Sequence, residues 1–241
     1  MNRRRRKFRT KYGPIFRPFR GIVKLFKKSP VIIDLNDEPV EKNAIFLSNH
    51  SGASGPITLS LYMPTFIVPW GTYEMVGNYP TRWKYLYYVF YQQKIGYKKF
   101  KSFILATLLA VISKMLYRGM QLIPTYQDLR LSYTIKNSID ALDAGIGILI
   151  FPEDSTAGYK DELVGYNGGF ALLHERYYKQ KNIDIPIYPL YYSKKHNALY
   201  IGKKEYVKPL YDKNLTRDEI AEHFKNVTNE YGAMLFEKYG E

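Results

Sequence analysis

The chain has 241 residues and no cysteine, which excludes a disulfide scaffold, a thiolate zinc site and a cysteine nucleophile. Hydrophobic residues make up 46% of it, enough to bury a sizeable core, so a disordered chain is also excluded. The formal net charge is +14, and 12 of the 36 basic residues lie within residues 1–28, whereas the other 24 nearly balance the 22 acidic residues.

Residues 1–30 are predicted to form a basic arm followed by an amphipathic helix at a membrane interface. No acidic residue precedes Asp34, so we expect an anionic partner, either lipid headgroups or nucleic acid. Four apolar residues recur at steps of three and four, as on one face of a helix: Ile15, Phe19, Ile22 and Phe26. This pattern suits a helix lying in a membrane interface, and the alternative is an ordinary surface helix with a basic outer face. Charges interrupt the segment that follows the basic start, so no secretory signal is predicted.

Residues 31–241 are predicted to form one α/β domain. After a turn-rich link at 34–43, the expected strands are 44–48, 65–68, 121–124, 146–151, 185–191 and 198–201. The expected helices are 57–62, 81–91, 100–117, 127–144, 169–179 and 215–238, the last with Asn214 as its N-cap. Because strands alternate with helices, we predict a mixed, mostly parallel sheet flanked by helices.

The longest apolar stretch, residues 103–112, lies between Lys101 and Lys114. It is much shorter than the roughly 18 residues of a membrane-spanning helix. We therefore expect the protein to lie peripherally on the cytoplasmic face of a membrane, bound to anionic lipids, without crossing it.

Two turns that follow predicted strands carry the candidate chemistry. His50 stands after strand 44–48 among small residues, and its ordinary pKa suits a general base near neutral pH. Glu153 and Asp154 follow strand 146–151. Ligands of such sheets bind beyond the carboxyl ends of strands, so the two turns are expected to share a site. The alternatives are a loop histidine that serves only the fold and a polar turn that caps the next segment. The three other histidines are expected on the surface.

The order of these motifs resembles that of the glycerophospholipid acyltransferase family, which includes the 1-acylglycerol-3-phosphate acyltransferases. The four motifs are Asn49-His50, the stretch 119–124, Phe151-Pro152-Glu153, and the stretch 185–189. Residues 158–163 and 168–170 are similar to the segment after the third motif, and Thr72 to Met75 fall at a Lys/Glu/Leu-like patch of the family. The resemblance covers about residues 40 to 195.

The resemblance implies a mechanism in which the histidine deprotonates an acceptor hydroxyl, which then attacks an acyl thioester of coenzyme A or acyl carrier protein. Carried over by position, His50 is the base and Glu153 an acceptor-site residue. The candidate catalytic residues are His50, Asp154 and Glu153, and the candidate substrate-binding residues are Asn49, Ser51, Gly52, Glu74, Gln127, Ser155 and Thr156. No metal and no bound cofactor are expected, because the acyl-CoA or acyl-ACP is a co-substrate.

Three departures from the family pattern concern the site itself. Gly55 stands where the family has the aspartate that orients the histidine, and Asp154-Ser155-Thr156 replaces Gly-Thr-Arg. The arginine of the second motif falls near Tyr126 or Gln127, neither of which is cationic. In one hypothesis Asp154 or Glu153 approaches His50 as the missing carboxylate, and the acceptor is not a lysophosphatidate. In the other, the protein binds lipid without catalysis.

The sequence also permits two other classes of protein. Ser51 and Ser54 near His50 permit a hydrolase, but Pro56 replaces the last glycine of a nucleophile elbow. The basic arm and 24 tyrosines permit a nucleic-acid-binding module. The tyrosines are spread through core-like segments and no RNA-binding signature is present, so a nucleic-acid partner is not expected.

Overall fold

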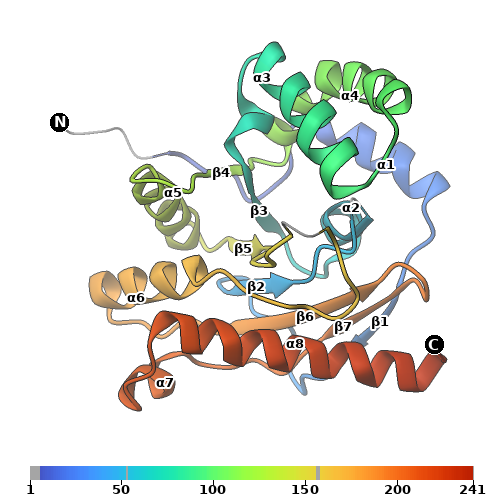
Figure 1. The fold of residues 1–241 in the computed structure, drawn as a ribbon. Coiled ribbons are helices and arrows are strands. Elements are labelled where there is room, and N and C mark those ends of the chain that lie inside the picture. The colour runs from blue at the N-terminus through green and yellow to red at the C-terminus, as the bar shows by residue number, and fades with distance from the viewer. Residues whose placement is uncertain (1–5, 53, 156–157, 241) are drawn as a thin grey trace.

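The computed structural model describes residues 6–52, 54–155 and 158–240, and its centre is a seven-stranded sheet (Figure 1). The spatial order is β1-β7-β6-β2-β5-β3-β4. Every neighbouring pair is parallel except β6 and β7, which are antiparallel. The strands are β1 (Val31–Asp34), β2 (Ile45–Ser48), β3 (Ile67–Thr72), β4 (Ile123–Thr125), β5 (Gly147–Ile150), β6 (Ile187–Ser193) and β7 (Ala198–Ile201). The predicted α/β class with a mixed, mostly parallel sheet is confirmed.

The central strands are short apolar runs that are buried along their whole length. Strand β2 lies between β5 and β6, with Ile45 in register with both Ile148 and Ile187. Each of these strands is covered on both faces, which is why its sequence is continuously apolar and shows no alternation.

Helices cover the two faces of the sheet unequally. One face packs against α5 (Leu131–Asp143), α6 (Gly169–Lys181) and α8 (Arg217–Tyr239), whose buried residues join those of β2 and β5 in the largest apolar cluster. The other face packs against α2 (Ser54–Tyr62). Figure 1 shows α8 running along β6 and β7, and the short α7 (Lys208–Asp212) precedes it. These layers leave the carboxyl ends of β2 and β5 side by side.

A second, smaller cluster forms beyond β3. It joins η1 (Tyr73–Val76), α3 (Tyr79–Lys84), the π-helix η2 (Tyr85–Lys94) and α4 (Lys99–Gly119). Trp83 and Tyr87 stack within it, and Phe103 of α4 meets both rings edge-on. The cluster carries Lys94, the last residue of η2, toward the turns after β2 and β5.

Helix α1 (Phe16–Phe26) packs on the C-terminal end of α4 through a close backbone approach. Phe16 is buried, and a Cβ added at Gly119 would lie 2.5 Å from the Phe16 Cβ, so only glycine fits there. The exposed residues of α1 include large apolar side chains beside Arg17 and Lys24: Leu25 is 82% exposed and Phe26 is 85% exposed. Three residues of the predicted apolar face, Ile15, Ile22 and Phe26, are thus solvent-exposed, whereas Phe19 is half-buried.

Helix α4 is longer than the apolar stretch picked out in the sequence. Its 21 residues are long and apolar enough to cross a membrane by length and composition alone, and 22% of its most apolar window is buried. One side of α4 packs against α3 and η2. The other side exposes large apolar residues, namely Phe100, Phe103, Ile104, Leu108, Val111, Ile112 and Met115. Helices α1 and α4 contact each other, and we call their exposed apolar residues the apolar face.

Three sequence predictions are corrected by the fold. Strand β1, which the sequence analysis did not predict, pairs with β7 and includes Asp34, the first residue of the predicted link. Helix α8 is capped by Thr216 and not by Asn214, because Thr216 and Glu219 form a reciprocal capping box. His174 was expected on the surface, but it lies in α6 with no exposed area and contacts Asp184 at 2.7 Å.

Candidate active site

The turns after β2 and β5 meet, although they are about a hundred residues apart in the chain. The backbone N–H of His50 donates a 2.8 Å hydrogen bond to the carboxylate of Glu153. The pairing of β2 with β5 brings this contact about, because parallel neighbours place their carboxyl ends at the same edge. The predicted convergence of the two turns is therefore present, but Glu153 holds the His50 backbone and not its ring.

The ring of His50 is oriented by a backbone carbonyl. Its Nδ1 lies 3.0 Å from the carbonyl oxygen of Gly52. A carbonyl oxygen only accepts, so Nδ1 carries the hydrogen and the neutral ring presents Nε2 as its basic nitrogen. No described residue hydrogen-bonds this Nε2. Ser51 and Gly52 both adopt positive φ, which turns the Gly52 carbonyl back toward the ring.

Gly55 cannot be replaced by the family aspartate in this loop. A Cβ at Gly55 would lie 2.2 Å from the carbonyl oxygen of His50, a backbone atom that cannot swing aside. With glycine at position 55, the loop follows a path in which the Gly52 carbonyl holds the imidazole.

Two aromatic rings enclose the imidazole. Phe151 and Tyr159 each place their ring centroid 4.7 Å from that of His50, and the residue as a whole is half-buried. Burial lowers the pKa of His50 to about 4; the Gly52 hydrogen bond opposes this shift and the positive charge of Lys94 adds to it. His50 is therefore neutral throughout the physiological range. Two surface cavities stand out among the described residues, and neither is lined by His50.

Lys94 is a site residue that the sequence analysis missed. Its ammonium donates a 2.7 Å hydrogen bond to the hydroxyl of Ser155 and lies 5.7 Å from the ring centroid of Tyr159. Burial lowers the pKa of Lys94, while Glu153, Asp154 and Glu74 raise it, so three carboxylates lie within electrostatic reach of one ammonium. Burial also raises the pKa of Glu153, against the effect of the His50 N–H and of Lys94.

Several predicted site residues serve the fold or lie apart from the ring. Both polar groups of the Asn49 side chain are taken by the backbone of Tyr192, at 3.0 and 2.8 Å, and Asn49 is buried. Asn49 therefore ties the end of β2 to β6, and its substrate-binding role stays a prediction. Asp154 is exposed, and its backbone N–H donates to the carbonyl of Gly165 at 2.9 Å.

The remaining predicted residues are distributed around this edge of the sheet. Glu74 lies in η1, where the hydroxyl of Thr72 donates to its carboxylate. Gln127 is exposed in the turn after β4, and no contact between described residues joins it to His50. Ser155 is buried and holds Lys94. Thr156 lies outside the described residues.

Comparisons with known proteins show the fold. No protein-family model matches this sequence, and no curated protein matches it. Among solved structures, the chain is similar to the crystal structure of the 1-acyl-sn-glycerophosphate (LPA) acyltransferase PlsC from Thermotoga maritima, with a TM-score of 0.51 and 13% sequence identity. The match covers 90% of this chain and 76% of that chain. At this identity the two proteins share an α/β fold, and the chemistry must be argued from the residues present here.

Proposed function

We propose that this protein is a membrane-associated O-acyltransferase that moves an acyl group from acyl-CoA or acyl-ACP to a hydroxyl of a lysophospholipid-like acceptor. The observation that carries the proposal is the orientation of His50. Its Nδ1–H is held by the Gly52 carbonyl beside the Glu153 turn, on a fold similar to that of an acyltransferase. This orientation makes Nε2 the proton acceptor.

The reaction needs one proton carrier and no redox chemistry. His50 Nε2 takes the proton of the acceptor hydroxyl as its oxygen attacks the thioester carbonyl. The new C–O bond forms and the C–S bond breaks. The imidazolium then returns the proton to the departing thiolate, so the site ends as it began.

The charges around Lys94, which lies beside the His50 turn, favour an acceptor without a phosphomonoester beside its reacting hydroxyl. Three carboxylates, those of Glu153, Asp154 and Glu74, influence Lys94, whereas Lys94 is hydrogen-bonded to Ser155. A dianionic phosphate placed here would face more negative than positive charge. We therefore expect neutral or zwitterionic lysolipids, or a monoacylglycerol, to be better acceptors than lysophosphatidate.

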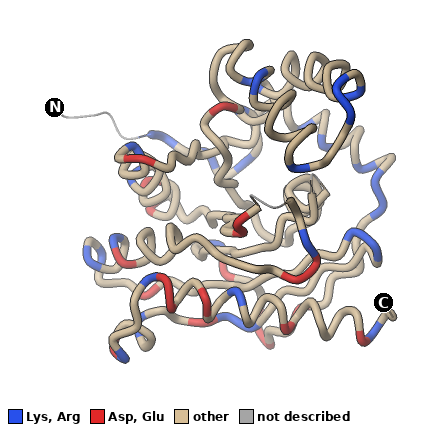
Figure 2. Tube along the Cα trace, viewed as in Figure 1, with Lys and Arg blue, Asp and Glu red and all other residues tan. Residues whose placement is uncertain are grey.

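The apolar face supports attachment to the cytoplasmic face of a membrane as a peripheral protein. Leu25, Phe26 and Phe100 are each more than three-quarters exposed. Large exposed apolar residues gathered on two helices that contact each other are typical of a membrane or protein contact. The basic residues of the arm and of α1 add attraction to anionic headgroups (Figure 2). Because one side of α4 packs against α3 and η2, a peripheral position preserves contacts that a spanning α4 would break.

The test is acyl transfer from acyl-CoA and from acyl-ACP onto a panel of lysolipids, monoacylglycerol and lysophosphatidate, with product detected by mass spectrometry. Wild-type protein should acylate at least one acceptor, and His50→Ala should lower kcat/KM by about 10²–10⁴-fold. Equal rates for the two proteins would remove His50 as the base. A preference for lysophosphatidate would overturn the acceptor class alone.

A lipid-binding protein without catalysis is the second candidate, favoured by the two rings that enclose His50 and by Gly55 in place of the family aspartate. It predicts saturable lysolipid binding that His50→Ala leaves intact, with no acyl product from any donor. Binding with no turnover across the panel would select it over the enzyme.

A further inference from the structure

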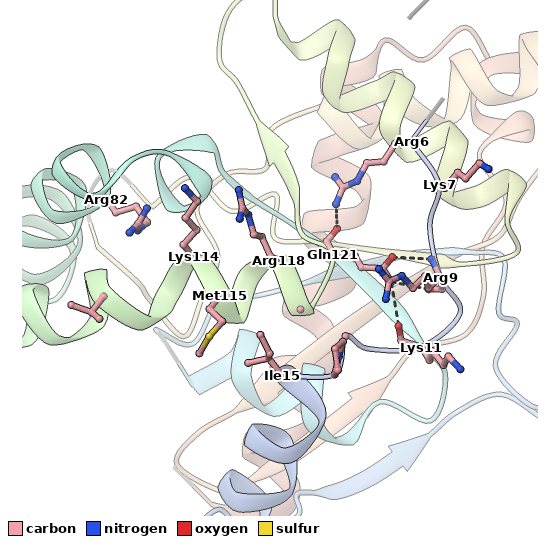
Figure 3. Close-up of a pocket in the computed structure, with 14 residues that line it drawn as sticks. Arg6, Lys7, Arg9, Lys11, Ile15, Arg82, Lys114, Met115, Arg118 and Gln121 are labelled. Carbon is pink, nitrogen blue, oxygen red and sulfur yellow. Dashed lines mark hydrogen bonds between the residues drawn. The ribbon is translucent and has the colours of Figure 1, made fainter. Parts of the chain in front are cut away.

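A basic groove lies away from His50, between the N-terminal arm and the C-terminal half of α4 (Figure 3). Its volume is about 540 Å³. Seven cationic side chains and no acidic one line it among the described residues, and the cations are Arg6, Lys7, Arg9, Lys11, Arg82, Lys114 and Arg118. Figure 3 shows those of the arm on one side and those of α3 and α4 on the other.

None of these seven side chains forms an ion pair within the described part of the chain. Arg82 is buried, and its guanidinium donates only to the backbone carbonyls of Ala110 and Gly77. Burial lowers the pKa of Arg82, and the neighbouring charge of Arg118 lowers it further. A buried cation beside a second cation is costly to keep, and an anion bound between them would offset that cost.

Hydrogen bonds to backbone and amide groups fix the walls of the groove, and none of them brings a carboxylate to its cations. The Arg6 guanidinium donates to the carbonyls of Gln121 and Leu122, at 2.8 and 3.1 Å. Arg9 and Gln121 exchange two bonds through the Arg9 backbone, at 2.8 and 2.7 Å. The carboxylate of Asp140 meets the backbone N–H of Arg6, outside the residues that line the groove. The guanidinium groups of Arg6 and Arg82 are thus held by backbone carbonyls and not by carboxylates.

The groove opens onto the apolar face. Ile15, Val111 and Met115 line it and are themselves exposed members of that face. Charge in the groove and exposed hydrocarbon at its rim fit an amphiphile whose headgroup is anionic. We propose that this groove binds the headgroup of an anionic phospholipid carrying more than one negative charge. The proposal rests on the proposed membrane association and adds a site and a lipid class to it.

The test compares phosphatidylcholine vesicles containing cardiolipin, which has two phosphates, with vesicles containing phosphatidylserine at equal total charge. Wild-type protein should bind the cardiolipin vesicles about tenfold more tightly in flotation assays. Lys114→Gln/Arg118→Gln should lose this preference. The control variant is Arg17→Gln/Lys28→Gln, which removes one exposed cation of α1 and one just after it, both outside the groove. It should weaken binding to both kinds of vesicle alike and keep the preference for cardiolipin.

A second groove variant, Lys7→Gln/Arg9→Gln, changes the arm and leaves α4 intact, so misfolding of α4 cannot explain its result. It should also lose the preference for cardiolipin. Equal cardiolipin binding by the groove variants and the α1 control would overturn the headgroup site.

If wild-type protein binds neither kind of vesicle, the proposed membrane association itself fails. Titration with the deacylated cardiolipin headgroup then tests the groove alone, and no saturable binding there rejects it. Displacement from vesicles by inorganic pyrophosphate or by a short RNA at equal phosphate concentration would assign the groove to those anions instead.

Discussion

Two histidines of this protein sit in contrasting regions, one at the carboxyl edge of the sheet and one in the packed helical layer. His174 has no exposed area, and its Nε2 lies 2.7 Å from the carboxylate of Asp184. His50 is half-buried, and its Nδ1 meets only the Gly52 carbonyl. Burial lowers the pKa of both rings. The imidazole–carboxylate pair that the family resemblance led us to seek at His50 is found instead at a position that joins α6 to the loop before β6.

The contrast shows that an imidazole–carboxylate pair does not by itself identify a catalytic histidine. At His174 the Asp184 carboxylate meets Nε2 of a fully buried ring, a contact that satisfies a polar atom in the packed layer. At His50 a carbonyl supplies the orientation, and no described residue hydrogen-bonds the basic nitrogen. Position at the edge where β2 and β5 end is the stronger sign of function.

The largest expected effect is that replacing His50 lowers activity, whereas replacing His174 lowers stability. His50→Gln should lower kcat/KM by about 10²–10⁴-fold while changing the free energy of unfolding by less than about 1 kcal/mol. His174→Gln should do the opposite, costing about 1–3 kcal/mol of stability because Asp184 loses its partner, with the activity of the folded fraction unchanged. Steady-state kinetics and urea unfolding of both variants check this. A stability loss in His50→Gln equal to that in His174→Gln would erase the distinction.

Gly55 tests whether the carbonyl-held ring is a property of this loop. Gly55→Asp places the family residue at its position, but its Cβ would lie 2.2 Å from the His50 carbonyl oxygen. We expect a loss of about 1–3 kcal/mol in urea unfolding and no gain in activity. In Gly21→Ala, the matched control, nothing lies within 4 Å of the added Cβ, and α1 should be unchanged or up to about 1 kcal/mol more stable. A stable and more active Gly55→Asp would show that the loop accepts the family dyad.

Much of this arrangement was predictable from the sequence. The runs Ile45–Ser48 and Gly147–Ile150 are short, apolar and followed by small or polar residues, so strands with functional turns at their ends were expected. Their pairing follows from the rules of parallel sheets. The capping box of α8 was also readable, because a glutamate stands three residues after Thr216.

The rest depended on contacts between distant segments. Lys94 ends an aromatic π-helix in a separate cluster, and no local pattern marks it as a neighbour of Ser155. The burial of His174 was missed because α6 is rich in polar residues and its apolar face is weakly marked. The steric role of Gly55 needs the path of the His50 backbone, which spacing alone does not give.

The smallest expected effect concerns the protonation of His50 and the part that Lys94 plays in it. Ring titration by NMR should place the pKa of His50 at about 4, below the ordinary value of 6.5, with the His50→Gln spectrum assigning the signal. Lys94→Met removes a positive charge that disfavours the imidazolium, so the pKa of His50 and the acid limb of the pH–rate profile should both move to higher pH. Lys94→Arg, which keeps the charge, should leave them near the wild-type values.

The same shift has a defined sign for stability. Because the folded ring has the lower pKa, the unfolded chain binds more protons between pH 6.5 and about 4, so the His50 contribution to stability falls as the pH falls through that window. The raised pKa of Glu153 acts in the opposite direction, so the comparison must be made between wild type and His50→Gln. The difference in their unfolding free energies should change by at most about 1.4 kcal/mol per pH unit there. A difference that does not vary with pH would mean that His50 titrates as an ordinary exposed histidine, and the enclosure by Phe151 and Tyr159 would then have no energetic consequence.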